Sequence, residues 1–458
     1  MINIQSDSRK IKPGDTFVAL RGISSDGHNY INKAIELGAT KIVAEDGSYS
    51  VETIIVPDTR EYLNNYLKEN YNKYLNEMNI IGITGTNGKT TTAKLLHDAL
   101  NKMGSKTAYI GTIGFYIDKK ICDLPNTTVD ICDTYDLIMK AYDEGCNNVI
   151  MEISSHSLAM GRVKTLEFDY AIFTNLTQDH LDYHKTMGNY ALAKQQLFKQ
   201  LKPNGVAIIN DDDKYKEYYL LKENKNITYG FKSGDFKIND YYLTKNYTDF
   251  VYEYQEKYYE VKSKLLGKYN IYNLLALIAT LSTMGLKQEK IIEYIPDLEA
   301  PVGRMEIIKY NTNSIIIDYA HTPDAVEKVM SAVSEIEKGK VYVVFGCTGD
   351  RDRLKRPIMT EYVANHSEYF IITNDDPHYE DTQQIVEDMT KDLEKNNYEV
   401  CLDREEAIVR GINLLHENDI LFILGKGHEE SMIIKDKKIP FSDRKVVVEY
   451  LNSLKGDK

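Results

Sequence analysis

One segment, Gly85–Thr91 (GTNGKTT), constrains the fold of this chain more than any other feature of its sequence. It follows a short apolar run, Asn79–Thr84, which predicts a buried parallel strand, and it precedes a helix predicted at Lys89–Met103. Glycines in such a turn let backbone N–H groups point at phosphate oxygens, and the helix N-terminus adds a potential that favours anions. The segment therefore predicts a phosphate-binding loop at the end of a parallel strand.

Two side chains of this loop carry chemistry of their own. Lys89 can neutralise terminal phosphates, and the Thr90 hydroxyl can bind Mg²⁺. Ile83 stands where the standard pattern has glycine, so the loop is a shortened variant. The alternative is an ordinary glycine-rich turn, which would leave the Lys-Thr pair between strand and helix unexplained.

Two further polar clusters also follow predicted strands. Glu152–His156 (EISSH) comes at the end of a strand predicted at Asn148–Ile153, and Thr174–His184 (TNLTQDHLDYH) follows one predicted at Tyr170–Thr174. A carboxylate that ends a buried strand beside a phosphate loop suits Mg²⁺, which prefers oxygen ligands. The second cluster holds two histidines and two aspartates within six residues, a density that favours a site over isolated surface side chains.

The length of 458 residues fits three domains of about 150 residues each. Residues 1–78 predict a small α/β domain, residues 79–300 a central domain built around the loop, and residues 301–458 a second doubly wound, Rossmann-like domain. The third domain is predicted from five strands at residues 314–318, 340–345, 369–373, 399–402 and 420–424. The stretch Tyr215–Tyr259 alternates like antiparallel strands, and Pro301–Gly303 is a candidate hinge.

Charge and composition limit the environment. The formal net charge of -13 disfavours binding to nucleic acid or to an anionic membrane. No run of 18 apolar residues and no apolar leader occur in the sequence, so we expect neither a membrane span nor a secretion signal. The five cysteines have no CxxC spacing, which is typical of reduced thiols in the cytoplasm.

Taken in order, the three clusters resemble those of the Mur ligase family. The resemblance runs from Asp7-Ser8-Arg9 to about Arg444. Further motifs that carry it are YALAK at 190–194 with Leu197 and Phe198, Gly267 with Asn270 and Asn273, GRME at 303–306, DYAHTP at 318–323, GDRDR at 349–353, KRP at 355–357 and GKGHE at 425–429. Within the family, the motifs most resemble the ligases that add the third residue of the peptidoglycan stem peptide.

This resemblance implies an α/β protein with three domains: one for the UDP end of a substrate, a central P-loop ATPase domain, and a C-terminal Rossmann-like domain for an incoming amino acid. It implies contacts to the UDP-linked muramoyl dipeptide from Ser6, Ser8, Ile23, Ser24, Ser25, Thr127, Thr128, Ser154, Met160 and Arg162. It implies contacts to ATP from Gly85, Thr86, Asn87, Gly88, Lys89, Thr90, Thr91, Asn270, Arg304 and Asp318. The contacts to the amino acid would be Arg351, Asp375, Asp376, Pro377, His378, Gly425 and Glu429.

The resemblance also implies two Mg²⁺ sites and a modified lysine. Thr90 and Glu152 would serve one ion, and His180 and Lys194 the other. A free ammonium cannot bind a cation, so Lys194 would carry a CO₂-derived carbamate. Lys89, Glu152, His180 and Lys194 are thus the expected catalytic residues.

The implied reaction is the ATP-dependent, ADP-forming addition of a diamino acid to UDP-N-acetylmuramoyl-L-Ala-D-Glu through an acyl phosphate, in cytoplasmic peptidoglycan synthesis by a monomer. The basic residues Arg353, Lys355 and Arg356 would face phosphate or form a solvated charged run, two equally weighted interpretations.

One motif departs from the family pattern. Ligases that add meso-diaminopimelate have Asp-Asn-Pro-Arg where this chain has Asp375-Asp376-Pro377-His378. The missing arginine would pair with the distal carboxylate of diaminopimelate, and the extra carboxylate of Asp376 would attract a distal ammonium. We therefore expect L-lysine as the first candidate, with meso-diaminopimelate still possible because a protonated His378 can donate to a carboxylate.

Three other interpretations remain. The first is a related ligase with another acceptor, such as a folylpolyglutamate synthetase or a cyanophycin-type ligase. The second is a non-catalytic paralogue that acts as a binding subunit. The third is a generic P-loop kinase or motor ATPase. The Ser-Ser-His cluster and the Asp7-Ser8-Arg9 start argue against the first, and the intact candidate catalytic residues argue against the second. The third leaves the C-terminal third unexplained.

Overall fold

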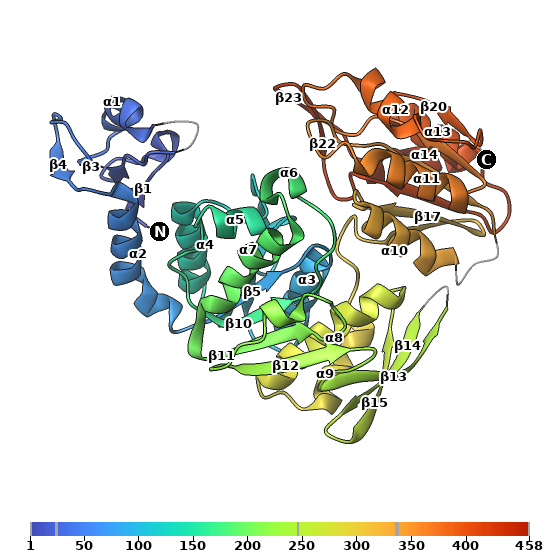
Figure 1. Ribbon diagram of the computed structural model, residues 1–458, viewed down its shortest axis with the longest axis horizontal. Coiled ribbons are helices and arrows are strands. Elements are labelled where there is room, and N and C mark those ends of the chain that lie inside the picture. The colour runs from blue at the N-terminus through green and yellow to red at the C-terminus, as the bar shows by residue number, and fades with distance from the viewer. Residues whose placement is uncertain (1, 23–25, 245–246, 335–338, 457–458) are drawn as a thin grey trace.

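The computed structural model describes residues 2–22, 26–244, 247–334 and 339–456, and three sheets organise them (Figure 1). A four-stranded, an eleven-stranded and a six-stranded sheet follow one another along the chain, and a two-stranded hairpin is added near the C-terminus. In Figure 1 the first part (blue) and the third part (orange) lie above the central part, on opposite sides. None of the helices in the described ranges is long and apolar enough to cross a membrane.

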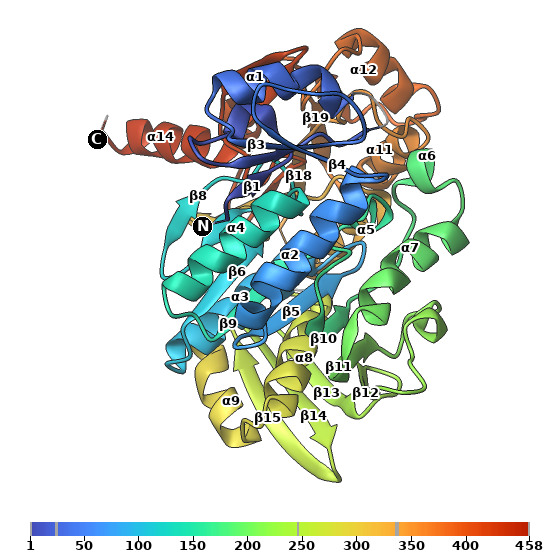
Figure 2. The same ribbon diagram turned by 90° about the vertical axis from the view of Figure 1, so that its left-hand side faces the viewer.

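The first part is a small parallel sheet with one long helix. Its strands, in sheet order, are β1 (Ile4–Gln5), β2 (Thr16–Val18), β3 (Lys41–Ala44) and β4 (Glu52–Ile55). Helix α1 (Ile31–Glu36) follows β2, and α2 (Thr59–Leu75) leads into the central part. Helix α2 begins at Asp58, whose carboxylate accepts hydrogen bonds from two backbone N–H groups of the first turn, and its Leu63 and Leu67 are fully buried. Figure 2 shows α2 lying beside α4 (Ile131–Asp143) of the central part.

The central sheet places β5 (Asn79–Thr84) inside a run of seven parallel strands. From one end of the sheet to the other the strands are β15 (Lys257–Ser263), β14 (Thr248–Tyr254), β13 (Phe236–Leu243), β12 (Lys225–Gly230), β11 (Leu201–Asn210), β10 (Phe168–Phe173), β5, β9 (Asn148–Glu152), β6 (Thr107–Gly111), β7 (Gly114–Tyr116) and β8 (Lys120–Cys122). The run β13 to β6 is parallel throughout. The carboxyl ends of β10, β5 and β9 therefore lie side by side.

Helices cover both faces of this sheet, which explains the continuous apolar sequence of β5. Ile81 and Ile83 belong to one core with the buried leucines of α3 (Lys89–Lys102) and α8 (Lys268–Thr283). Ile80 belongs to the other, with α4 and α7 (Met187–Lys199). Two short helices, α5 (Ser155–Ala159) and α6 (Leu181–His184), follow β9 and β10, and α9 (Gln288–Tyr294) follows α8.

The third part is doubly wound, as predicted. Its sheet order is β16 (Glu306–Tyr310), β17 (Asn313–Asp318), β21 (Ile420–Leu424), β18 (Val341–Phe345), β19 (Tyr369–Ile372) and β20 (Tyr398–Val400). All pairs are parallel except β16 with β17. Helices α10 (Pro323–Ser334), α11 (Lys355–His366) and α12 (Thr382–Thr390) share one core, and α13 (Arg404–Asn413) and α14 (Asp443–Gly456) share the other. The hairpin β22 (Ser431–Ile434) and β23 (Lys437–Pro440) follows β21.

The predicted strands and helices that flank the three motif clusters are present within one or two residues of their predicted ends. Antiparallel pairing in the stretch 215–259 is confirmed for β13 to β15 and wrong for β12, which pairs in parallel with β11. The domain boundaries after residues 78 and 300 and the hinge at Pro301–Gly303 stay predictions.

Candidate active site

The phosphate-binding loop lies between β5 and α3, where the sequence predicted it. Gly85 and Gly88 have φ of 152° and 85°, and Gly88 caps α3, so the loop uses backbone conformations that favour glycine. The segment after β10 holds the loop in place. The carbonyl of Asn87 accepts hydrogen bonds from Thr174 Oγ1 (2.6 Å) and Asn175 Nδ2 (3.0 Å). Two of the three sequence clusters are thus in direct contact.

Two lysines converge on one carbonyl of this loop. Lys89 Nζ donates to the carbonyl oxygens of Gly85 (2.9 Å) and Thr86 (2.7 Å), and Lys194 Nζ donates to the same Gly85 oxygen (2.8 Å). Burial lowers the pKa of Lys89. Burial and the neighbouring Lys89 ammonium hold the pKa of Lys194 well below its ordinary range. Lys194 therefore carries a larger fraction of neutral, nucleophilic amine at neutral pH than a surface lysine does.

Glu152 is the centre of a buried hydroxyl–carboxylate cluster. Its Oε2 accepts from Thr90 Oγ1 (2.8 Å) and Thr112 Oγ1 (3.1 Å), while Oε1 accepts from the Tyr109 hydroxyl and from Thr112 N (3.0 Å). The predicted pair of Thr90 and Glu152 is therefore in contact. A carboxylate and a hydroxyl at the end of a phosphate loop form a donor set that fits Mg²⁺. Sequence reasoning missed Tyr109 and Thr112, although Thr112 follows β6 and so obeys the same strand-end pattern.

His180 lies in a group of aromatic and histidine rings beside Lys194. Its ring centroid is 4.7 Å from that of His156 and 6.1 Å from that of Tyr190, whose ring also lies 4.6 Å from Lys194 Nζ. Burial lowers the pKa of His180, and burial together with His156 lowers the pKa of His184 to about 4. Both rings are thus neutral at pH 7, the form of imidazole that binds a cation.

A cavity of about 390 Å³ opens between the phosphate loop and the third part of the chain. It is lined from the central part by Asn87, Gly88, Thr91 and Asn270, among others, and from the third part by Arg304, Asp318, Tyr319 and His321. The volume is within the usual range for a small-molecule site. Three residues outside the loop were also predicted to contact ATP, and all three line the cavity: Asn270, Arg304 and Asp318.

The walls of this cavity are connected across the two sheets. Arg304 Nη2 donates to Thr90 Oγ1 (3.3 Å), and the Arg304 guanidinium lies 4.5 Å from the centre of the Tyr319 ring. Asn87 Nδ2 donates to Asp324 Oδ2 (2.7 Å), so the loop also contacts the first turn of α10. Asp318 accepts from the N–H groups of Met305 and Ala320, and burial raises its pKa.

The residues predicted to bind an amino acid gather at the carboxyl end of the third sheet. Asp375 and Asp376 follow β19, and Gly425 and Glu429 follow β21. A Cβ on Gly425 would lie 2.5 Å from Asp375 Oδ2, so the two segments touch. Gly349 N donates to Asp376 O (2.8 Å), which brings the segment that carries Arg351 to the same place. Pro377 follows Asp376 on the segment after β19. His378 comes next, has a φ of 50°, and pairs through its backbone with β22.

A fully buried lysine that sequence reasoning missed occupies the middle of this cluster. Lys426 Nζ lies 2.7 Å from Asp376 Oδ1, 2.8 Å from Glu429 Oε2 and 3.7 Å from Asp375 Oδ1. Ile433 N also donates to Asp376 Oδ1 (2.9 Å). Asp376 therefore has an internal cation, and the prediction that its carboxylate is free to attract an incoming ammonium is wrong.

The alternative in which Arg353 and Arg356 face phosphate is also wrong. Arg356 is fully buried, and its guanidinium donates to both oxygens of Glu380 (2.6 Å each) and to Asp388 Oδ2 (2.8 Å). Arg353 Nε donates to the same Asp388 oxygen (2.7 Å). Their role is to join α11 to α12. Lys355 differs, because its ammonium is close enough to contribute, after burial, to lowering the pKa of His321 to about 4.

The residues predicted to contact the UDP-linked substrate fall into two groups. Four of them are joined to the Glu152 cluster. Thr127 Oγ1 lies 3.0 Å from Thr112 Oγ1, and Thr128 Oγ1 donates to Glu152 O. Thr128 in turn accepts from Ser154 N through its hydroxyl and from Arg162 Nη1 through its carbonyl. Met160 is exposed nearby, one residue after α5. Ser6 and Ser8 lie in the first part, where Ser6 Oγ is 3.7 Å from Cys132 Sγ of α4. Ile23, Ser24 and Ser25 lie outside the described residues.

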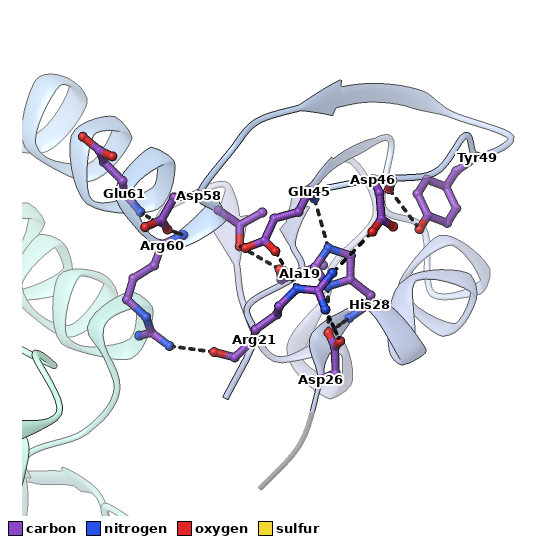
Figure 3. A network of polar contacts seen from close by, with 11 residues as sticks. Ala19, Arg21, Asp26, His28, Glu45, Asp46, Tyr49, Asp58, Arg60 and Glu61 are labelled. Atoms are coloured by element: carbon purple, nitrogen blue, oxygen red, sulfur yellow. Dashed lines mark hydrogen bonds and ion pairs between the residues drawn. The ribbon is translucent and has the colours of Figure 1, made fainter. Parts of the chain in front are cut away.

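A polar network surrounds the ends of that undescribed segment (Figure 3). Arg21 and Asp26 pair as a β-bridge, and the Arg21 guanidinium contacts Glu45 (2.5 Å) and Asp26 (3.2 Å). His28 Nδ1 lies 2.7 Å from Asp26 Oδ1, while its Nε2 accepts from Glu45 N (3.0 Å). The described residues that flank this segment, Arg21 and Asp26, are therefore connected to Glu45, which follows β3, by Arg21 directly and by Asp26 through His28.

Comparisons with known proteins agree with this geometry. Three family models match: "Mur ligase family, catalytic domain" at residues 2–87, "Mur ligase middle domain" at 83–281 and "Mur ligase, glutamate ligase domain" at 303–427. A Clostridium botulinum protein named UDP-N-acetylmuramoyl-L-alanyl-D-glutamate–2,6-diaminopimelate ligase is 41% identical over 98% of this chain and 95% of its own length.

Two solved structures extend the comparison. One, titled as a UDP-N-acetylmuramoyl-L-alanyl-D-glutamate–2,6-diaminopimelate ligase, matches with a TM-score of 0.70 and 30% identity over 99% of this chain and 95% of that one. A MurF ligase from Thermotoga maritima in complex with ADP matches with a TM-score of 0.73 over 100% and 98% of the two chains. At 18% identity, the second shows the shared fold alone.

Proposed function

Because this chain belongs to the Mur ligase family, we propose that it joins a free diamino acid to UDP-N-acetylmuramoyl-L-Ala-D-Glu, with conversion of ATP to ADP and phosphate. One observation carries the proposal. Thr90 of α3, Glu152 of β9 and Arg304 of the third part meet at the end of the phosphate loop, beside the cavity of about 390 Å³. The arrangement suits charge stabilisation on a phosphoryl group in transfer.

In the proposed reaction, a substrate carboxylate oxygen attacks the γ-phosphorus of ATP, the bond from that phosphorus to the ADP oxygen breaks, and an acyl phosphate forms. The amine nitrogen of the amino acid then attacks the acyl carbon, phosphate leaves, and the nitrogen loses a proton. Lys89 and Arg304 contribute positive charge near the phosphates. The hydrogen bond from Asn87 to Asp324 holds the third part against the loop. This contact helps to keep water from the acyl phosphate.

Two metal sites are part of the proposal. Thr90 and Glu152 would hold one Mg²⁺, and His180 and carbamylated Lys194 would hold the second. The buried, partly neutral amine of Lys194 suits reaction with CO₂. When bound, Mg²⁺ offsets the negative charge of the phosphates.

The amino acid we propose first is meso-diaminopimelate. The expectation of L-lysine was based on the missing arginine and on a free Asp376 carboxylate, and that carboxylate is instead paired with Lys426. The relatives described above are named for 2,6-diaminopimelate. His378 follows Asp376-Pro377 with its backbone fixed to β22, and we propose that its imidazole donates to the distal carboxylate.

The test is a product assay with ATP, Mg²⁺, UDP-N-acetylmuramoyl-L-Ala-D-Glu and one amino acid at a time, read by mass. We expect a product with meso-diaminopimelate. A product with L-lysine alone would overturn the choice of amino acid and leave the ligase standing. No product with meso-diaminopimelate, L-lysine or L-ornithine would point to another acceptor or to a non-catalytic paralogue.

We also expect activity to depend on CO₂. In CO₂-free buffer the rate should fall about tenfold, because an uncarbamylated Lys194 offers no anionic oxygen to the second cation; one misplaced electrostatic contact costs roughly this much or more. Added bicarbonate should restore the wild-type rate and should not restore Lys194→Arg. A carbamate ¹³C resonance from labelled bicarbonate, present in the wild type and absent in the variant, gives a readout apart from activity. An unchanged rate after degassing would contradict the modification.

A further inference from the structure

A single buried arginine connects the two segments that carry the candidate amino-acid site. Arg404 is the first residue of α13 and only 2% exposed. Its Nη1 donates to the carbonyl of Asn374 (3.1 Å) and its Nη2 to the carbonyl of Leu424 (3.0 Å). Asn374 directly precedes Asp375, and Leu424 directly precedes Gly425. The guanidinium therefore holds the starting points of both segments.

The same guanidinium is anchored from behind by the C-terminal helix. Arg404 Nε and Nη2 donate to the two carboxylate oxygens of Asp443 at 2.7 and 2.8 Å, and both side chains of this ion pair are fully buried. Asp443 is the first residue of α14. Four hydrogen bonds thus join α13, α14 and the carboxyl ends of β19 and β21 through one planar group.

This arrangement opposes two ordinary preferences. A cation at the first residue of a helix meets the positive end of the helix dipole, and a fully buried charge loses its hydration. A lysine would reach one or two of these oxygens as a point charge, whereas the guanidinium fork reaches all of them at fixed angles. The geometry itself, and not merely a positive charge, is what the site requires.

In front of Arg404, the segments it holds contact each other. Gly425 is in close contact with the Asp375 carboxylate, and Lys426 joins Asp376 to Glu429. A shift of either segment would therefore move the candidate contacts to the amino acid that both segments carry. None of these bonds involves the phosphate loop, whose own partners include Thr174 and Asn175 after β10, Lys194 of α7, Arg304, and Asp324 of α10.

We propose that Arg404, held by Asp443, is a positioning residue for the incoming amino acid: it sets the separation of the two segments that bind it. This inference rests on the proposed function. It predicts that loss of the guanidinium fork raises the KM for the amino acid. The KM for ATP and the formation of the acyl phosphate should be little affected.

The experiment compares Arg404→Lys with the wild type in two assays. The first half-reaction is followed without amino acid, by trapping the acyl phosphate with hydroxylamine; the full reaction is followed by product mass. We expect trapping within about twofold of wild type and a rise in KM for the amino acid of about 10- to 100-fold, the usual consequence of a misplacement of roughly 1 Å. The KM values for ATP and for the UDP-linked substrate should change little.

Arg410→Lys is the matched control, since Arg410 lies on the same helix and forms only exposed ion pairs with Glu399 and Glu406. It should behave as wild type in both assays. If Arg404→Lys does not fold, Asp443→Asn decides by the same measurements, because it keeps the arginine and removes its anchor. Equal rises in all three KM values, or an unchanged KM for the amino acid, would overturn the inference. An absence of trapped product in the wild type would instead overturn the proposed function.

Discussion

Replacing Lys89 by methionine should lower the turnover number by about 10³-fold, because a single preorganised donor at a developing negative charge contributes a factor of roughly 10² to 10³. Lys89 is partly buried at the end of the loop and already donates to the carbonyls of Gly85 and Thr86. Burial lowers its pKa, so the neutral methionine should be tolerated by the fold. Steady-state kinetics with a thermal unfolding scan would separate the two effects.

Lys102→Met is the matched control for this prediction. Lys102 lies in the last turn of the same helix, is exposed, and donates only to the carbonyl of Asp297. Its replacement should leave the turnover number within about twofold, as is usual for surface substitutions. A loss of less than tenfold in Lys89→Met would place the lysine away from the transferring phosphoryl group.

The largest effect on stability should come from Lys426→Met, which we expect to lower the free energy of unfolding by about 3 kcal/mol at pH 7. Burial opposes the charge of Lys426, but Asp375, Glu429 and Asp376 hold its pKa above the ordinary value. Methionine fills the space and leaves three carboxylates without their cation. Unfolding in denaturant measures the difference.

The sign of the pH dependence provides a second check. Burial already raises the pKa of Glu429 above its ordinary 4.5, and removing the ammonium should raise it further. A carboxyl group with a raised pKa in the folded state adds stability at low pH and loses that contribution as the pH rises through the folded pKa. The loss in free energy of unfolding caused by Lys426→Met should therefore be smaller at pH 5 than at pH 7.

The control for stability is Lys445→Met, which removes an exposed lysine 3.7 Å from Glu449. Its effect should stay within about 0.5 kcal/mol at either pH. If Lys426→Met lowers the free energy of unfolding by no more than Lys445→Met does, the three carboxylates are protonated or hydrated in the folded protein.

The sequence predicted the parts of the site that obey a local rule. Polar residues at or directly after the ends of buried strands, such as Glu152 and Thr174, are found where expected because the carboxyl ends of parallel strands share one edge. Residues whose role depends on a distant partner were not predicted. Lys426 pairs with Asp376, 50 positions away, and Arg404 with Asp443, 39 positions away.

The interpretation of Arg353 and Arg356 as phosphate ligands failed for the same physical reason. A run of basic residues after a strand has the composition of an anion site, and nothing local shows that Glu380 and Asp388 will pack against it. Likewise, the sequence shows the two acidic residues at 375 and 376 but not the ammonium that balances them.

The two sheets that form the site have a consequence for how variants combine. Most of the groups that we propose act on phosphate belong to the central part, with Arg304 added from the third part, whereas the groups proposed to bind the amino acid follow strands of the third sheet. Within the part of the chain that the structure describes, Lys89 and Arg404 share no hydrogen-bond partner. The free-energy effects of Lys89→Met and Arg404→Lys should therefore add in the double variant. Such independence would let laboratory evolution exchange the amino acid that is accepted, by changes confined to residues 374–380 and 425–433, while the activating chemistry is inherited unchanged.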